Sequence, residues 1–193
     1  MMSEFARFYA SCLIRYTQST FLELVTDTEV HRIDFRGKIS AHLQRGCRGP
    51  VSFYYEHPLL SGIQGQTVSL MARATRHYLA DAPALLAAIR QEIRVQAGEW
   101  YDFVPHTWAM WWQHLYAHNI VPNLTRTGGI ILGPVPVAVA QAMADICTRY
   151  GVETYFLPPP EQRLLPPMQT PYKLLLVGRN YVIAREFYVS TLR

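Results

Sequence analysis

The chain has 193 residues, of which half are hydrophobic and 17% are charged, against about a quarter charged in an ordinary soluble domain. Its length lets one core close without metals or crosslinks, and no apolar run reaches the roughly 20 residues of a membrane-spanning helix. The net charge of +4 is too small to indicate nucleic-acid binding by itself. We expect a soluble mixed domain outside the membrane, with a charge-poor surface suited to partner contacts.

The cysteines bear on the cellular compartment, and the basic residues bear on the kind of contact the protein makes. Cys12, Cys47 and Cys147 are widely spaced, and with no CxxC pair and no secretory signal they indicate a reducing cytoplasm, or a particle assembled there. Sixteen of the 18 basic residues are Arg, which forms planar contacts with carboxylates, phosphates and aromatic rings. An Arg-favouring codon bias explains this excess equally well.

The first 25 residues contain one segment with a helical spacing of apolar residues and a second segment whose pattern is ambiguous. Apolar residues recur at three- and four-residue steps between Phe5 and Tyr16, behind a potential N-cap at Ser3, which predicts an amphipathic helix. Residues 20–25 fit either a helix start or a strand.

The clearest alternation lies between residues 31 and 43, where every odd position from Ile33 to Leu43, apart from the glycine, is apolar and the even positions are polar. Because one strand of this length is unusual, we predict a hairpin that turns at residues 36–38 and pairs Phe35 with Ile39. Its exposed face and the following loop would present five basic residues, namely Arg32, Arg36, Lys38, Arg45 and Arg48.

The middle of the chain reads as strand, turn and helices. A strand is predicted over 51–56, a glycine-containing turn over 61–65, and a helical stripe from Val68 to Leu79. Asp81 and Pro83 begin a second helix over about 82–97. Four aromatic residues between His106 and His118 predict a third helix.

The last third of the chain carries the best supersecondary signal. Residues 128–157 read as strand, helix and strand, a βαβ unit whose strands run parallel and are usually adjacent. The proline-rich residues 158–171 predict an irregular connector or arm. The chain then forms a hairpin turned at 178–180, in which the continuously apolar residues 174–177 predict a strand covered on both faces.

No catalytic constellation is evident. Gly128 and Gly129 precede the strand instead of following it, and Pro134 and Pro136 remove N–H donors from the turn after the strand. A role in tight turns therefore explains the glycines better than phosphate binding does. His114 and His118 have a spacing that can chelate Zn²⁺, but no supporting glutamate is present. We therefore assign no metal site, no cofactor and no catalytic residue.

The sequence predicts an α+β (mixed α/β) fold with antiparallel hairpins and one βαβ unit packed with three to five helices. We expect a core domain over 1–157, a connector or arm over 158–171, and a C-terminal hairpin over 172–193 packed on the core or on a partner. The favoured function is a non-enzymatic structural or interaction subunit of a larger assembly, such as a virus-like or other multi-copy particle, with protein partners or further copies of itself. Its contact elements would be residues 31–43, 158–171 and 172–189.

Two alternatives stay open at this point. The first is a nucleic-acid-binding accessory protein that uses the basic residues of 31–48, which would serve equally to bind an acidic protein partner. The second is a small α/β enzyme or ligand-binding domain that uses the ends of the βαβ strands.

Overall fold

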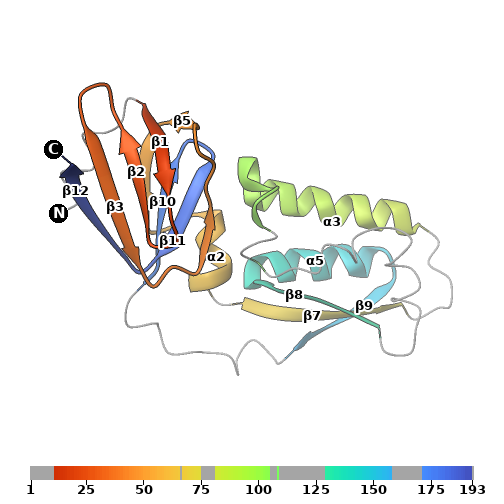
Figure 1. Cartoon of the computed structure of the whole chain (residues 1–193). Helices are drawn as coiled ribbons and strands as arrows, with labels where there is room; N and C mark the ends of the chain where they lie inside the picture. Colours follow the sequence, from red (N-terminus) through yellow and green to blue (C-terminus); the bar gives the residue numbers. More distant parts are fainter. Residues whose placement is uncertain are drawn as a thin grey trace. The chain divides into compact units, whose positions relative to one another are not determined.

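A computed structural model of the chain describes residues 11–65, 67–74, 81–104, 108, 129–157 and 171–192. The described part is a mixed α+β fold, mainly antiparallel sheet, with three α-helices. The chain divides into two compact units: unit 1 comprises residues 1–60 and 168–193, and unit 2 comprises residues 61–167 (Figure 1). Within the described ranges, no helix is both long and apolar enough to cross a membrane.

Unit 1 is built from two antiparallel sheets. Sheet A has the strand order β12-β3-β2-β1-β5, and sheet B has the order β4-β11-β10-β6. The strands are β1 (Cys12–Thr17), β2 (Phe21–Val25), β3 (Val30–Arg36), β4 (Ser40–His42), β5 (Arg48–Gly49), β6 (Val51–Tyr54), β10 (Lys173–Val177), β11 (Asn180–Ala184) and β12 (Glu186–Leu192). A short helix, α2 (Pro58–Gln64), follows β6 where the chain leaves unit 1.

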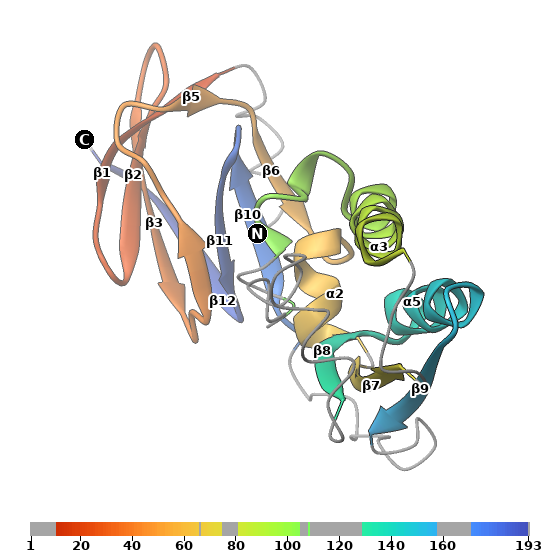
Figure 2. The same cartoon turned by 90° about the vertical axis from the view of Figure 1, so that its right-hand side faces the viewer.

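Three strand paths pass from one sheet to the other and close unit 1 into a barrel. β3 leads into β4 through Gly37, β5 into β6 through Pro50, and β11 into β12 through Arg185. The path β3–β4 pairs with β11–β12 on both sides of its bend, while β5–β6 joins β1 to β10. Every described strand path of unit 1 therefore has two neighbours, giving a six-stranded antiparallel barrel (Figure 2).

The barrel interior is filled by small and branched apolar side chains from both sheets. Alternate residues of β1, β2 and β3 point inward, as the period of two requires. The buried cluster consists of Cys12, Ile14, Leu22, Leu24, Ile33, Phe35, Val51, Leu175, Val177, Val182 and Ala184. Phe53 and Phe187 pack against this cluster. Their two rings meet each other edge to face, with ring centroids 5.2 Å apart.

The described part of unit 2 is a three-stranded sheet with two helices on one side. Sheet C has the order β8-β7-β9, and β7 is antiparallel to both neighbours. Its elements are β7 (Thr67–Ala74), α3 (Ala82–Ala97), the 3₁₀ turn η1 (Gly98–Trp100), β8 (Ile130–Pro136), α5 (Val137–Arg149) and β9 (Val152–Leu157). Helix α5 packs on the sheet and α3 packs on α5 (Figure 1).

Strand β8 contains a bulge that depends on glycine. The register moves from Val68 opposite Val135 to Leu70 opposite Leu132, so β8 has one extra residue at Gly133–Pro134. Gly133 has φ +121°, and a Cβ there would lie 2.9 Å from the Val68 carbonyl oxygen. No other residue type fits this position without displacing the backbone.

Several predicted elements are confirmed. Helix α3 spans 82–97, with the Asp81 carboxylate accepting from the Ala84 N–H as an N-cap. The strand–helix–strand order of 128–157 is present, and its two strands are parallel, but β7 lies between them. β10 and β11 pair as a hairpin, and residues 174–177 are all buried, as their unbroken apolar run predicts.

Two predicted helices are wrong where they can be compared. Residues 12–17 form β1, and residues 67–74 form β7. In β7, Val68, Leu70 and Ala72 are buried with a period of two. The helix prediction comes from the three- and four-residue spacing of Val68, Met71 and Ala72, so pairing with β8 and β9 decides the structure. The ambiguous residues 20–25 contain strand β2.

The predicted hairpin over 31–43 is also wrong. β3 and β4 do not pair with each other, because Gly37, at φ +64°, bends one long path between the sheets. Phe35 lies opposite Phe187, not Ile39, and the Ile39 N–H donates to the Ile183 carbonyl at 3.0 Å. A partner distant in sequence therefore replaces the local one.

Candidate functional site

Among the residues that the structure describes, no helix packs against one face of sheet C. The side chains of Val68, Leu70, Ala72, Ile130, Leu132, Val135 and Val152 point toward α5 and are all buried. The alternate residues of the three strands face the other way and form what we call the open face. Antiparallel sheets with one solvated face normally carry polar side chains there.

The open face instead carries an apolar row across all three strands. Met71 lies opposite Ile131 on one side and opposite Tyr155 on the other. Ile131 is 50% exposed and Tyr155 is 54% exposed. Beside the row, Arg73 lies opposite Glu153, whose carboxylate accepts a hydrogen bond from the Tyr155 hydroxyl at 3.1 Å. Such an apolar strip with a charged rim is typical of an interaction surface.

The two edges of sheet C differ in their capacity to bind another strand. On β8, Pro134 and Pro136 have no N–H, and the bulge at Gly133 interrupts the edge. β9 has no proline and, in the described ranges, pairs only with β7. β9 therefore presents the hydrogen-bonding edge of this sheet.

The predicted basic residues lie on unit 1 but do not form one continuous stripe. Arg32 and Arg36 project from β3, Lys38 lies in the bend after it, and Arg45 and Arg48 lie beyond β4. Arg48 pairs with Leu13 of β1, so two strands of sheet A separate it from β3, about 14 Å at normal strand spacing.

Acidic residues and aromatic rings occupy the space around these cations. Arg32 donates from two nitrogens to the Asp34 carboxylate, at 2.8 and 3.1 Å, and lies 3.8 Å from the centroid of the Phe21 ring. Arg36 lies opposite Glu186 in the sheet. These contacts are typical of a solvated barrel face with mixed charge, and they favour it over a surface that binds a phosphate backbone.

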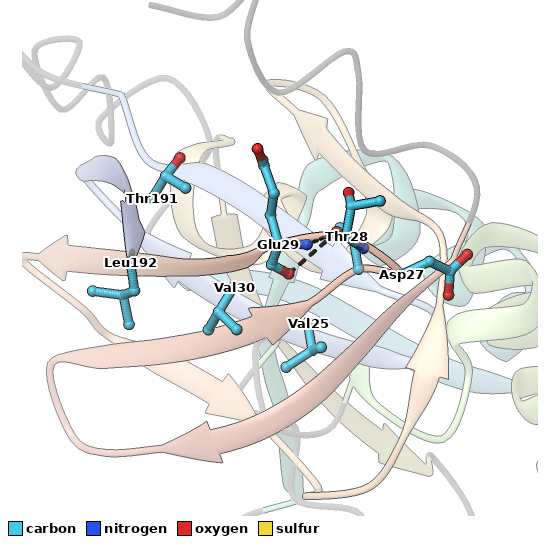
Figure 3. Close-up of a pocket in the computed structure, with 8 residues that line it drawn as sticks. Val25, Asp27, Thr28, Glu29, Val30, Thr191 and Leu192 are labelled. Atoms are coloured by element: carbon cyan, nitrogen blue, oxygen red, sulfur yellow. Dashed lines mark hydrogen bonds between the residues drawn. The ribbon is translucent and has the colours of Figure 1, made fainter.

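An open depression lies at the end of sheet A where the β2–β3 turn meets β12 (Figure 3). Val25, Val30 and Leu192 point to the same side of it, and Asp27, Thr28, Glu29 and Thr191 also line it. The Thr26 hydroxyl accepts from the N–H groups of Thr28 and Glu29 at 3.3 and 2.9 Å, which fixes the turn.

The His31 side chain contacts two of the residues that line this depression, Glu29 and Thr191 of β12. Its side chain is 3% exposed, its Nδ1 lies 3.3 Å from the Thr191 hydroxyl, and its Nε2 lies 3.2 Å from a Glu29 carboxylate oxygen. A hydroxyl, an imidazole and a carboxylate in series resemble the arrangement that activates a nucleophile. Such a site also needs N–H donors for the oxyanion, and the N–H groups of Thr28 and Glu29 in the nearby turn already donate to the Thr26 hydroxyl. We assign these contacts the role of fastening β12 to β3.

The His31 contacts predict a pH-dependent stability. Burial lowers the pKa of His31 below its ordinary value of 6.5, although Glu29 partly opposes the shift. The unfolded chain therefore binds more protons between the folded-state pKa and about pH 6.5, and stability falls as the pH falls through this window. Urea unfolding between pH 7.5 and pH 5 should show this loss in the natural chain. His31→Gln should remove that part of the slope, whereas Thr191→Val, which keeps the imidazole, should retain it.

The three cysteines should differ in reactivity. Burial raises the pKa of Cys147 to about 12, and burial together with Asp27 raises the pKa of Cys12. Cys47 is only partly buried. Because thiolates react and thiols do not, a disulfide reagent at neutral pH should modify Cys47 at least about tenfold faster than the other two. Cys47→Ser should abolish the fast phase, and an unchanged fast phase would contradict this assignment.

The candidate metal ligands His114 and His118, the predicted aromatic helix and most of the predicted arm lie outside the described residues. Trp108 of that aromatic segment is described and is buried. Among the described residues, no group of three or more His, Cys, Asp or Glu side chains is placed to hold a metal ion. The open face could not be predicted from the sequence, because the spacing of apolar residues in the β7 segment predicts a helix.

The described residues define a two-unit α+β chain that combines a closed antiparallel barrel with a three-stranded sheet bearing an apolar row on one face. No family model, curated protein or solved structure matches this chain. The functional argument therefore depends on the chain's own surfaces.

Proposed function

We propose that this chain is a non-enzymatic interaction subunit of a larger assembly and that the open face of sheet C is its main contact surface. The observation that carries the proposal is the row Ile131–Met71–Tyr155, which crosses all three strands of sheet C on the face opposite α5 and contains two half-exposed side chains. Burying half-exposed Ile and Tyr side chains against a partner would gain roughly 25 cal/mol per Å² of apolar area.

The composition supports the same function. Only 17% of the residues are charged, and contact surfaces are depleted in Lys, Glu and Asp. The nucleic-acid alternative receives less support, because Arg32 is bound by Asp34 and Arg36 faces Glu186. Binding of the chain to nucleic acid, with an affinity that falls steeply as the salt concentration rises, would support this alternative.

The test combines solution mass with a variant of the open face. Native mass spectrometry and light scattering across concentration should reveal species heavier than the 22.1 kDa chain, alone or with a purified partner. Ile131→Asp should reduce this association at least about tenfold, because it buries a charge without a counter-ion, while circular dichroism stays unchanged.

The matched control is Val95→Asp. Val95 is 65% exposed on helix α3, in the same unit, and does not belong to the open face. It should leave the association intact. A 22.1 kDa species at every concentration, with no partner whose binding Ile131→Asp disrupts, would overturn the proposed function.

A further inference from the structure

We propose that one partner of this chain is a second copy of itself, joined at the edge of sheet C by antiparallel pairing of β9 with its symmetry mate, so that two copies of sheet C form one continuous six-stranded sheet and their open faces lie side by side. This inference rests on the proposed function and names its partner. Edge strands bind added strands through main-chain hydrogen bonds, and β9 is the edge of sheet C without proline.

The sequence of β9 is complementary to itself in one register. With Thr154 opposite its own copy, Val152 lies opposite Phe156 and Glu153 lies opposite Tyr155. Thr–Thr and aromatic–branched pairs are among the favourable cross-strand pairs. The Tyr155 hydroxyl, which already donates to Glu153 at 3.1 Å within one chain, would have the same acceptor across the interface.

Neighbouring registers are worse. A shift of one residue sets open-face side chains against helix-side ones. Centring the pair on Glu153 opposes two carboxylates, which is destabilising. Centring it on Tyr155 sets Pro158, which has no N–H, opposite Val152. The register centred on Thr154 has none of these faults, and a two-fold axis through that pair makes the contact closed.

The same register explains the exposure of β9 and brings the two apolar rows together. Thr154 and Phe156 are only half-buried although they lie on the helix-covered face of sheet C, because they stand at its edge. A second β9 would cover them. On the open face, Tyr155 would lie opposite Glu153 of the second copy and diagonal to its Tyr155, so the two apolar rows would lie side by side with an offset of two residues.

A charge-swap experiment at Thr154 tests the inference on the full chain. The natural chain should be a dimer by light scattering at high concentration. Thr154→Lys and Thr154→Glu should each weaken self-association about tenfold, because each sets like charges directly opposite at the axis. An equimolar mixture of the two variants should restore the dimer. Variants that stay dimeric alone, or a mixture that stays monomeric while both variants are folded, would overturn the inference.

Crosslinking provides a second measurement that does not depend on a charged variant folding. In a Cys47→Ser background, Thr154→Cys should form an intermolecular disulfide under mild oxidation, because paired residues bring their Cβ atoms within reach. Ser190→Cys, at an exposed position of β12, should not. Self-pairing fails if the natural chain is monomeric and Thr154→Cys does not crosslink. The proposed function still stands in that case if Ile131→Asp abolishes binding to another protein. If Ile131→Asp weakens no association while Thr154→Cys still crosslinks, the open face is not the contact surface and the proposed function fails there, whereas self-pairing through β9 stands.

Discussion

Replacing Ile33 with alanine is expected to lower the free energy of unfolding by about 3 kcal/mol, whereas Ile39→Ala should change it by less than about 0.5 kcal/mol. Both isoleucines belong to the same alternating pattern and to the same bent path through the barrel. Ile33 is 0% exposed in the interior cluster, while Ile39 is 45% exposed after the bend at Gly37. The first substitution therefore opens a cavity, and the second removes atoms already in contact with water.

Urea unfolding of the two variants and the natural chain measures this difference, with circular dichroism confirming that both variants fold. The comparison controls for residue type, since the same side chain is truncated in each case. A hairpin over 31–43 would bury both isoleucines on one face and make the two losses similar. Equal losses would therefore contradict the barrel path and favour the local hairpin.

The sequence predicts elements well where the signal is local. Helix α3 has its own N-cap at Asp81, and α5 lies between glycine- and proline-marked boundaries, so neighbouring residues specify where each begins and ends. The pairing within β10–β11 depends on a short turn and is equally visible. Prediction fails where a strand's partner is far away in sequence.

Residues 30–42 show why such partners are hidden. Their alternation predicts a half-buried strand correctly, but nothing nearby indicates that the pairing partner lies at 180–192. The same limit applies to the candidate site. β9 and β8 are predicted, yet the open face exists only because β7 lies between them. The spacing of Val68, Met71 and Ala72 predicts a helix in place of β7.

Closure of the barrel makes a further strong prediction at Gly49, the last residue of β5. Gly49 pairs with Cys12 of β1, and the next residue, Pro50, accepts a hydrogen bond from the Gly178 N–H at 2.9 Å. A Cβ at Gly49 would lie 2.5 Å from Gly178 Cα and 2.6 Å from its nitrogen. Both are backbone atoms of the β10–β11 turn, so the clash cannot be relieved by a side-chain rotation.

Gly49→Ala should therefore destabilise the chain by about 2–3 kcal/mol, since the barrel seam must open to admit one methyl group. Gly46→Ala is the matched control: Gly46 has φ +77°, but no atom lies within 4 Å of the position that a Cβ would take there, so the substitution should cost about 1 kcal/mol from backbone conformation alone. Urea unfolding of the two variants separates the effects. A loss at Gly49 no larger than that at Gly46 would mean that β5 does not approach the β10–β11 turn, and the six strands would then form two open sheets instead of a closed barrel.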